Sequence, residues 1–190
     1  MNHILETYKN ELNNEVLNIY QDDYCTDPRE DTNLTTMIFF HSRYNLGDDH
    51  NINADDFSGW DEMKAHLLKT EDIITIEPVY MYEHSGIALS TSPFSCRWDS
   101  GQIGFIYVSK ASYIECCGNV DSHSLEMANA GIKHELGLYG DYIEGNVFYA
   151  ELIGEDGLEI DSCGGFIGYD NLLINICDCF GLDDKLFNAV

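Results

Sequence analysis

The stretch PVYMYEHSGIALSTSPFSCRWDSGQIGFIYVSK, residues 78–110, predicts the centre of the fold. It contains two apolar runs, Val79–Tyr82 and Ile103–Val108, which are rich in the β-branched and aromatic residues typical of strands. A polar insert separates them. The insert collects side chains that are able to do chemistry, namely His84, Ser85, Ser90, Thr91, Ser92, Ser95, Cys96, Asp99 and Ser100.

Residues 3–20 carry apolar side chains at a helical spacing, with Glu and Asn on the other face. This pattern predicts an amphipathic N-terminal helix over 3–20. Residues 21–35 and 45–56 lose this periodicity and are rich in Asp and Glu, so both are expected to be solvated acidic loops.

Further strands are expected at Met37–Phe40 and at Ile73–Tyr82, where Pro78 favours an edge position or a bulge. The segment NVFYAELI-GEDG-LEIDSC, residues 146–163, predicts a β-hairpin, because Asp-Gly between two strand-like runs is a strong turn signal. It places a hairpin in the C-terminal half of the chain.

Three helices complete the pattern. The first is expected to start at an N-cap on Ser58, with Asp61 three residues later, and to run to Leu68. The second is clearest over residues 122–135 and is expected to end at Gly137 and Gly140, and the third covers residues 171–180. No linker or repeat interrupts the chain. The sequence therefore predicts a single α+β domain, with a mostly antiparallel sheet and flanking helices.

Charge is the most informative property of the composition. Thirty-four Asp and Glu face nine Lys and Arg, which gives a formal net charge of −25 over 190 residues. Nucleic acids and anionic membranes are poor partners for such a surface, because binding to them requires Lys and Arg. The expected complement of this charge is positive: a basic protein that binds nucleic acid, a metal cation, or the ions of a salty cytosol.

The seven cysteines are odd in number and irregular in spacing, which argues against a secreted disulfide framework. The N-terminal residues lack the pattern of a signal peptide, and no apolar run approaches the length of a membrane span. We expect a cytosolic protein with reduced thiols. The oligomeric state is left open.

Several phrases resemble a family of small acidic proteins carried by phages and conjugative elements of Gram-positive bacteria. They are FFHSRYNLGDDH, DDFSGWDEM, the stretch ending in PFSCRWDSGQIGFIYVSK, and IDSCGGFIG in the closing hairpin. No enzymatic activity is established for that family. The resemblance implies a mobile-element setting, in which small acidic proteins are often inhibitors of host restriction or CRISPR systems.

Within the polar insert, Cys96 and His84 are a candidate nucleophile and base, and Asp99 could orient the imidazole. This pattern leaves open a small Cys/His-dependent hydrolase or transferase. In the structural alternative, the hydroxyls and Asp99 satisfy the backbone of an irregular loop, and Phe94 and Trp98 pin it to the core.

Metal and cofactor motifs are weak. His41, His50, Asp48 and Asp49, or Cys163 with Cys177 and Cys179, were the best combinations, and neither matches the spacing of a zinc site or an EF-hand. No phosphate-binding or dinucleotide motif occurs. We expect no metal and no cofactor.

The acidic surface remains the strongest signal. Carboxylates displayed along a rigid face can approximate the charge row of DNA, which carries one charge per about 1.7 Å of axis. The hypothesis is a DNA mimic that occupies the basic groove of a CRISPR effector or restriction enzyme. The expected contact residues are Asp22, Asp23, Asp48, Asp49, Asp55, Asp56, Glu155 and Asp156.

Overall fold

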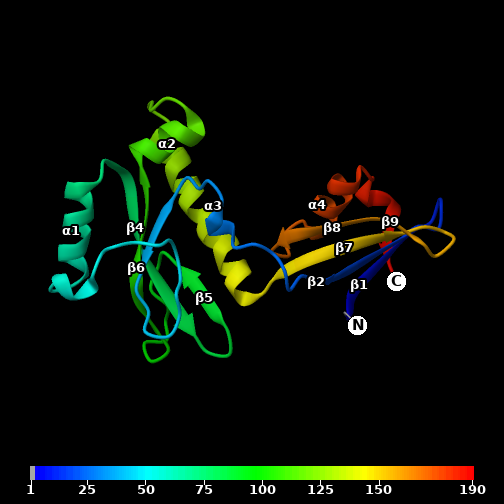
Figure 1. Ribbon diagram of the computed structural model, residues 1–190, viewed down its shortest axis with the longest axis horizontal. Coiled ribbons are helices and arrows are strands. Elements are labelled where there is room, and N and C mark those ends of the chain that lie inside the picture. The colour runs from blue at the N-terminus through cyan, green and yellow to red at the C-terminus, as the bar shows by residue number, and fades with distance from the viewer. Residues whose placement is uncertain (1–2) are drawn as a thin grey trace. The chain divides into compact units, whose positions relative to one another are not determined.

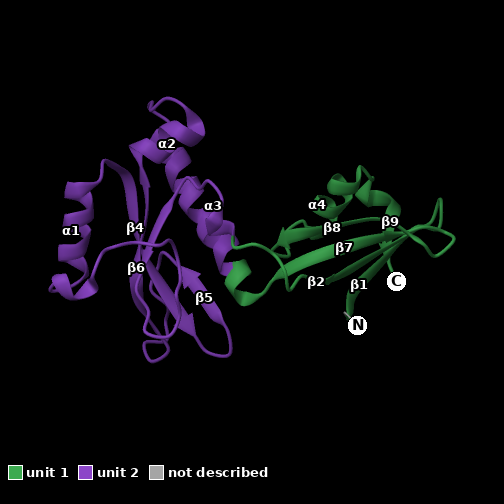
Figure 2. Ribbon diagram, in the orientation of Figure 1, with its two compact units in different colours: residues 1–27, 141–190 green, residues 28–140 purple. Residues whose placement is uncertain are grey.

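The computed structural model describes residues 3–190 as an α+β fold with two antiparallel sheets (Figure 1). The contacts of the chain gather in two compact units (Figure 2). Unit 1 contains residues 3–27 and 141–190 of the described chain, and unit 2 contains residues 28–140. The sequence predicts one domain, and within the α+β fold each unit has its own sheet and core. We therefore describe the units separately.

The sheet of unit 2 is formed around residues 78–110, the stretch with the two apolar runs. Its strands follow the order β3-β6-β4-β5, with all neighbours antiparallel. Their bounds are β3 (Thr36–Phe39), β4 (Ile73–Glu83), β5 (Ile87–Ser90) and β6 (Ser100–Ser109). The predicted strands around Val79 and Ile103 are confirmed, and the polar insert adds β5. Pro78 lies beyond the part of β4 that pairs with β5, and a register shift follows at Val79/Tyr80.

Helices cover both faces of this sheet, α1 (Trp60–Thr70) on one side and α3 (Ser124–Glu144) on the other (Figure 1). A short helix, α2 (Lys110–Cys117), follows β6 directly. Side chains alternate along a strand, so Ile38 packs with Met63 of α1, while its neighbour Phe39 contacts Tyr139 of α3. Among residues 3–190, no helix combines the length with the apolar character that a bilayer crossing requires.

Two predicted helix ends in unit 2 are wrong. The N-cap of α1 is Gly59, and the preceding Ser58 instead donates its N–H and its hydroxyl to the Glu62 carboxylate, at 2.8 and 2.6 Å. These hydrogen bonds lower the pKa of Glu62. Helix α3 passes through Gly137 and Gly140 and ends at Glu144, since burial of Tyr139 offsets the small cost of glycine within a helix.

Unit 1 is a five-stranded antiparallel sheet of order β8-β7-β2-β1-β9, with one helix against it (Figure 1). The bounds are β1 (Ile4–Asn10), β2 (Val16–Gln21), β7 (Val147–Ile153), β8 (Glu159–Ile167), α4 (Leu172–Phe180) and β9 (Phe187–Ala189). Leu17, Phe148 and Ile176 form the core between sheet and helix. The predicted hairpin and the predicted C-terminal helix are confirmed.

The predicted N-terminal helix over 3–20 is wrong, because this segment forms the β1–β2 hairpin. Asn10 and Asn13 build its turn by accepting the N–H groups of Leu12 and Glu15, at 2.9 and 3.1 Å, and Asn14 adopts a φ of 58°. Strand β2 gains its second partner from β7, which lies far along the sequence. The predicted acidic loops over 21–35 and 45–56 are largely irregular, each with one short 3₁₀ turn.

Candidate functional site

The eight acidic residues expected to contact a partner divide equally between the units. Unit 1 holds Asp22, Asp23, Glu155 and Asp156, and unit 2 holds Asp48, Asp49, Asp55 and Asp56. Their carboxylates differ in what they do within the fold. Some hold the backbone or a neighbouring side chain in place, and others are exposed to solvent.

Asp48 belongs to an ion-pair network inside unit 2. Its carboxylate accepts hydrogen bonds from Nε and Nη2 of Arg29 at 2.8 and 2.9 Å, and Glu135 accepts from Nη1 at 3.0 Å. The Arg29 side chain is only 5% exposed. Burial opposes its charge, but the hydrogen bonds and charges of Asp48 and Glu135 raise the pKa of Arg29 above its ordinary value. Asp48 therefore neutralises a buried cation and is not available as a surface contact.

Asp22 joins two backbone segments of unit 1. Its Oδ1 accepts the N–H of Tyr24 at 2.9 Å, and its Oδ2 accepts the N–H of Gly165 in β8 at 3.0 Å. Asp23, the next residue, is exposed, and its carboxylate makes no hydrogen bond to any described residue. Of this neighbouring pair, only Asp23 offers a carboxylate that the fold does not already use.

Glu155 and Asp156 lie where two turns of unit 1 meet. The register of β2 with β7 brings Val16 opposite Ile153, so the β1–β2 and β7–β8 turns leave the sheet at the same end. The side chain of Asn14 donates to Glu155 across the two turns at 3.1 Å. We call residues 11–15 and 154–160 together the hairpin tip.

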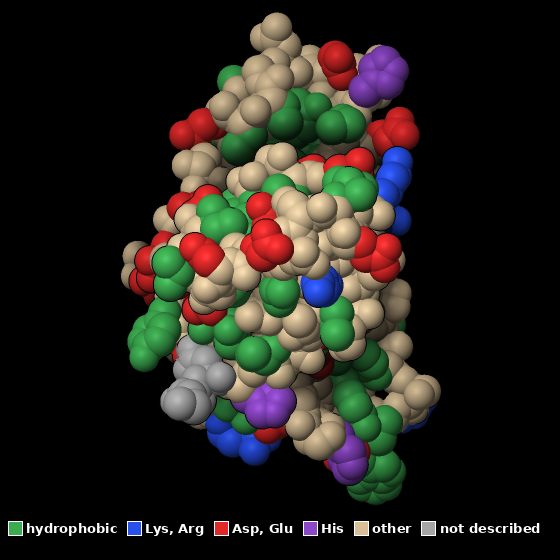
Figure 3. Space-filling view, turned by 90° about the vertical axis from the view of Figure 1, so that its right-hand side faces the viewer, with side chains coloured by type: hydrophobic (Ala, Val, Ile, Leu, Met, Phe, Trp, Pro, Cys, Tyr) green, Lys and Arg blue, Asp and Glu red, His purple; other side chains and the backbone are tan. Residues whose placement is uncertain are grey.

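The hairpin tip combines carboxylates with exposed apolar side chains. Leu12, Leu158 and Ile160 are 77%, 67% and 56% exposed. Five acidic residues share these two segments and no Lys or Arg does: Glu11, Glu15, Glu155, Asp156 and Glu159. Figure 3 looks onto the right-hand end of Figure 1, where both turns lie, and shows acidic and hydrophobic side chains interspersed there.

Leu12, Glu11 and Glu159 were not predicted from the sequence as surface residues of this tip. Leu12 was assigned to the apolar face of a helix, and the helical spacing of its neighbours concealed the turn. The run NELNNE, residues 10–15, was the available signal, because Asn residues favour turns. Its adjacency to the GEDG turn follows only from the pairing of β2 with β7.

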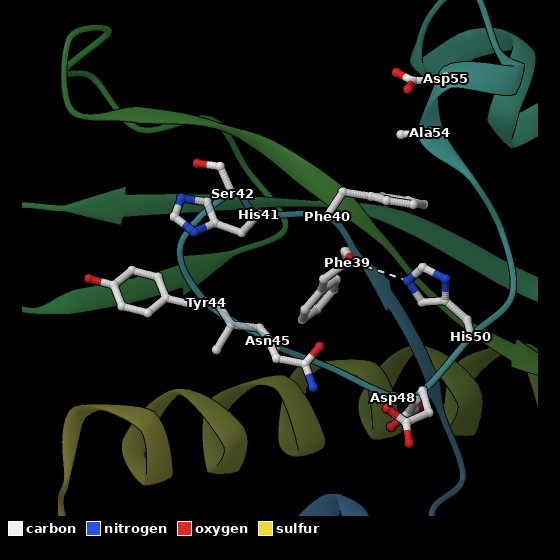
Figure 4. A pocket seen from close by; sticks show the side chains of 12 residues that line it. Phe39, Phe40, His41, Ser42, Tyr44, Asn45, Asp48, His50, Ala54 and Asp55 are labelled. Carbon is white, nitrogen blue, oxygen red and sulfur yellow. Dashed lines mark hydrogen bonds between the residues drawn. The ribbon is translucent and has the colours of Figure 1, made fainter.

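In unit 2, Asp49 and Asp55 line a cavity of about 630 Å³, and Asp56 is exposed beside it. Figure 4 shows this cavity between the end of β3 and the loop that follows. His50 contributes a hydrogen bond between Nε2 and the Phe39 carbonyl at 3.0 Å, while its Nδ1 is buried and meets no partner among the described residues.

The cavity does not assemble a metal site. Among residues 3–190, the structure brings together no group of three or more His, Cys, Asp or Glu side chains that could hold a metal ion. His41 stacks on Tyr44 instead, with ring centroids 5.1 Å apart. The combination of His41, His50, Asp48 and Asp49 considered from the sequence is therefore not a cluster of ligands.

The Cys96–His84–Asp99 group does come together in unit 2, but in an unexpected order. Oδ2 of Asp99 lies 3.4 Å from the Cys96 sulfur and 3.6 Å from Nδ1 of His84. The carboxylate, and not the imidazole, therefore faces the thiol. An activated cysteine needs an imidazole or a cation beside the sulfur, and a carboxylate anion does not stabilise a thiolate.

The aromatic residues of this loop also differ from expectation. Phe94 packs against Tyr82, with ring centroids 5.6 Å apart. Trp98 was expected to pin the loop to the core, but it is 95% exposed. The loop is held by hydrogen bonds, including one from the Ser100 hydroxyl to the Cys96 carbonyl, so a large side chain can remain in solvent.

We compared the chain with known proteins. No protein-family model, no curated protein and no solved structure matches it. The resemblance to acidic mobile-element proteins therefore stays a prediction.

Proposed function

We propose that this protein is a stoichiometric inhibitor of a host nucleic-acid-targeting defence system, an anti-CRISPR or antirestriction protein of a phage or mobile element. It binds the basic groove of a CRISPR effector or restriction enzyme in the bacterial cytosol, as a DNA mimic without turnover. The observation that carries this proposal is the uneven distribution of charge between the two units.

The segments of unit 1, residues 1–27 and 141–190, contain 17 of the acidic residues and only two basic ones, Lys9 and Lys185. Unit 2 contains the other 17 acidic residues but seven basic ones. The smaller unit therefore has the larger negative charge, a formal −15. Such a field attracts a basic groove and accelerates association in a salt-dependent way.

Within unit 1, the hairpin tip has the composition of a contact surface. Stable interfaces surround a partly apolar centre with a polar rim, and the centre supplies most of the affinity. Leu12, Leu158 and Ile160 supply apolar area, and four exposed acidic residues of the same two segments supply charge of one sign: Glu11, Glu155, Asp156 and Glu159. A groove lined with Lys and Arg stems complements both features, because those stems are apolar and their ends are cationic.

The experiment compares two variants with the same change in charge. The tip variant carries Glu11→Gln, Glu155→Gln, Asp156→Asn and Glu159→Gln. The matched control in unit 2 carries Asp49→Asn, Asp55→Asn, Asp56→Asn and Asp61→Asn, all exposed positions. Each protein is immobilised, exposed to host lysate at 50 and 300 mM salt, and then eluted with duplex DNA or with polyglutamate of equal charge.

We expect the parent and the unit 2 control to retain a nuclease or CRISPR effector at the lower salt and to release it to duplex DNA. The tip variant should retain about tenfold less, and the captured enzyme should lose DNA cleavage when the parent protein is added. If only the unit 2 variant failed to capture the enzyme, the contact surface would lie in unit 2 and not at the hairpin tip. Equal capture by both variants, or no basic partner, would overturn the proposal.

A further inference from the structure

Two cysteines of unit 1 lie against one another on different elements. Cys163 is on β8 and Cys179 is in the last turn of α4, and their sulfur atoms are 2.6 Å apart. Cys163 pairs in register with Ala150 of β7, whose side chain belongs to the core beneath α4. The Cys163 thiol thus points from the sheet to the helix that covers it.

The two thiols differ in access to solvent. Cys179 is exposed and Cys163 is half-buried. The hydrogen bond with Cys179, together with burial, raises the pKa of Cys163 to about 11, so this thiol keeps its proton in neutral solution. An external disulfide therefore reacts first with Cys179. The Cys163 sulfur then lies close to the mixed disulfide that forms on Cys179.

Three of the other five thiols have different surroundings. Cys177 is fully buried in the core of unit 1, and burial raises its pKa to about 11. Cys25 contacts the carbonyl oxygen of Thr26, and Cys96, in unit 2, contacts a carboxylate. Cys163 and Cys179 differ from these three thiols because their two sulfur atoms face each other.

We propose that Cys163 and Cys179 are a redox-active dithiol, which a low-molecular-weight disulfide converts to an intramolecular disulfide that ties α4 to β8. The Cys179 thiolate attacks the small disulfide, forming a mixed disulfide and releasing one small thiolate. Cys163 then loses its proton to solvent, and its sulfur attacks Cys179 and displaces the second small thiolate. The protein loses two electrons and two protons, and the reagent is reduced to two thiols.

The new bond closes a loop from the middle of β8 to the end of α4, which includes the whole helix. Cross-linking a loop of this size restricts the unfolded chain. It therefore favours the state in which Leu172 and Ile176 of α4 remain packed on the sheet. Cytosolic disulfides of this kind are usually transient and redox-sensing. The inference is independent of any partner of the hairpin tip.

The test treats the full-length protein with oxidised glutathione and maps its disulfides by peptide mass spectrometry. We expect one disulfide, Cys163–Cys179, a mass loss of two hydrogens, and a rise in the thermal midpoint of about 5–10 °C that dithiothreitol reverses. The control Cys116→Ser should behave like the parent. Cys163→Ser should stop at a glutathione adduct on Cys179.

Mapping in the parent protein does not depend on how the variants fold. A stable glutathione adduct on Cys179 of the parent would overturn the proposal. So would an intramolecular disulfide that joins any other pair, such as Cys177–Cys179 or Cys116–Cys117.

Discussion

Asp48 pairs with Met37 through both its backbone and its side chain. The N–H of Asp48 donates to the Met37 carbonyl at 2.9 Å, and the N–H of Met37 donates to Oδ2 of Asp48 at 2.8 Å. Met37 lies on β3, an edge strand of the unit 2 sheet, so Asp48 occupies hydrogen-bonding groups that an edge would otherwise expose. The same carboxylate neutralises Arg29. Asp48 therefore satisfies both backbone groups of Met37 at the sheet edge, and its carboxylate also pairs with the buried Arg29.

Asp48→Asn should destabilise unit 2, because it removes one of the two carboxylates that pair with the buried Arg29 guanidinium and leaves only Glu135. We expect a loss of about 1.5–3 kcal/mol, the range for a hydrogen bond to a charged group. Urea unfolding followed by tryptophan fluorescence measures it, since Trp60 and Trp98 both lie in unit 2. The exposed neighbour gives the control, and Asp49→Asn should stay within about 0.5 kcal/mol of the parent. If Asp48→Asn were as stable as the parent, the ion pairs of Arg29 would not stabilise unit 2.

Gly104→Ala should prevent close pairing of β3 with β6. A Cβ at Gly104 would lie 1.9 Å from the carbonyl oxygen of Ile38, and neither backbone can move without breaking the ladder. We expect a loss of at least about 3 kcal/mol. Gly137→Ala is the matched control in α3, where a Cβ meets no atom within 4 Å, and it should gain about 0.5–1 kcal/mol. Denaturant midpoints of the two variants should move in opposite directions.

The stability of unit 1 should fall in strong alkali through Tyr20. Burial, and then a 2.8 Å hydrogen bond to Glu151, raise the pKa of Tyr20 from 10.0 to about 12. The folded state thus holds the phenolic proton more tightly than the unfolded state. This contribution is complete below pH 10 and is lost as the pH rises toward 12. NMR of ¹³Cζ-labelled tyrosine, assigned with Tyr20→Phe, follows the titration.

Glu151→Gln provides the control for that titration. Removing the carboxylate should lower the pKa of Tyr20, while burial still holds it above 10. An unchanged titration in this variant would show that Glu151 has no part in the shift.

Cys96 should react as an ordinary thiol. Its sulfur faces the Asp99 carboxylate at 3.4 Å, and an anion beside the sulfur does not favour the thiolate. We expect iodoacetamide at pH 7 to label Cys96 no faster than the exposed Cys117, with both rates read by mass spectrometry. Labelling of Cys96 about tenfold faster would instead support the Cys/His-dependent hydrolase or transferase.

Local signals in the sequence predicted much of the fold. The hairpin of β7 and β8 followed from an Asp-Gly turn between two apolar runs, and the helix α4 followed from its apolar spacing and a closing glycine. The strands around Val79 and Ile103 were recognisable from their composition. These elements depend mainly on residues close together in the chain, so their propensities and turn chemistry were sufficient.

Residues 3–20 show where this reasoning failed. Their apolar spacing fits a helix, but Leu17 and Ile19 are buried because β2 pairs with β7 near the other end of the chain. Tertiary pairing overrides a local pattern when it buries more apolar surface. The hairpin tip follows from the same pairing, so its apolar and acidic side chains could not be grouped from the sequence.

The sequence by itself determined the charge of this protein, the α+β class and the elements with strong local signals. Only the tertiary structure decided which carboxylates are exposed, that Asp48 compensates Arg29, that Asp99 stands beside Cys96, and that Cys163 meets Cys179. The physical reason is the same in each case. A charge is a property of one residue, whereas burial, ion pairing and thiol contact depend on residues that folding brings together.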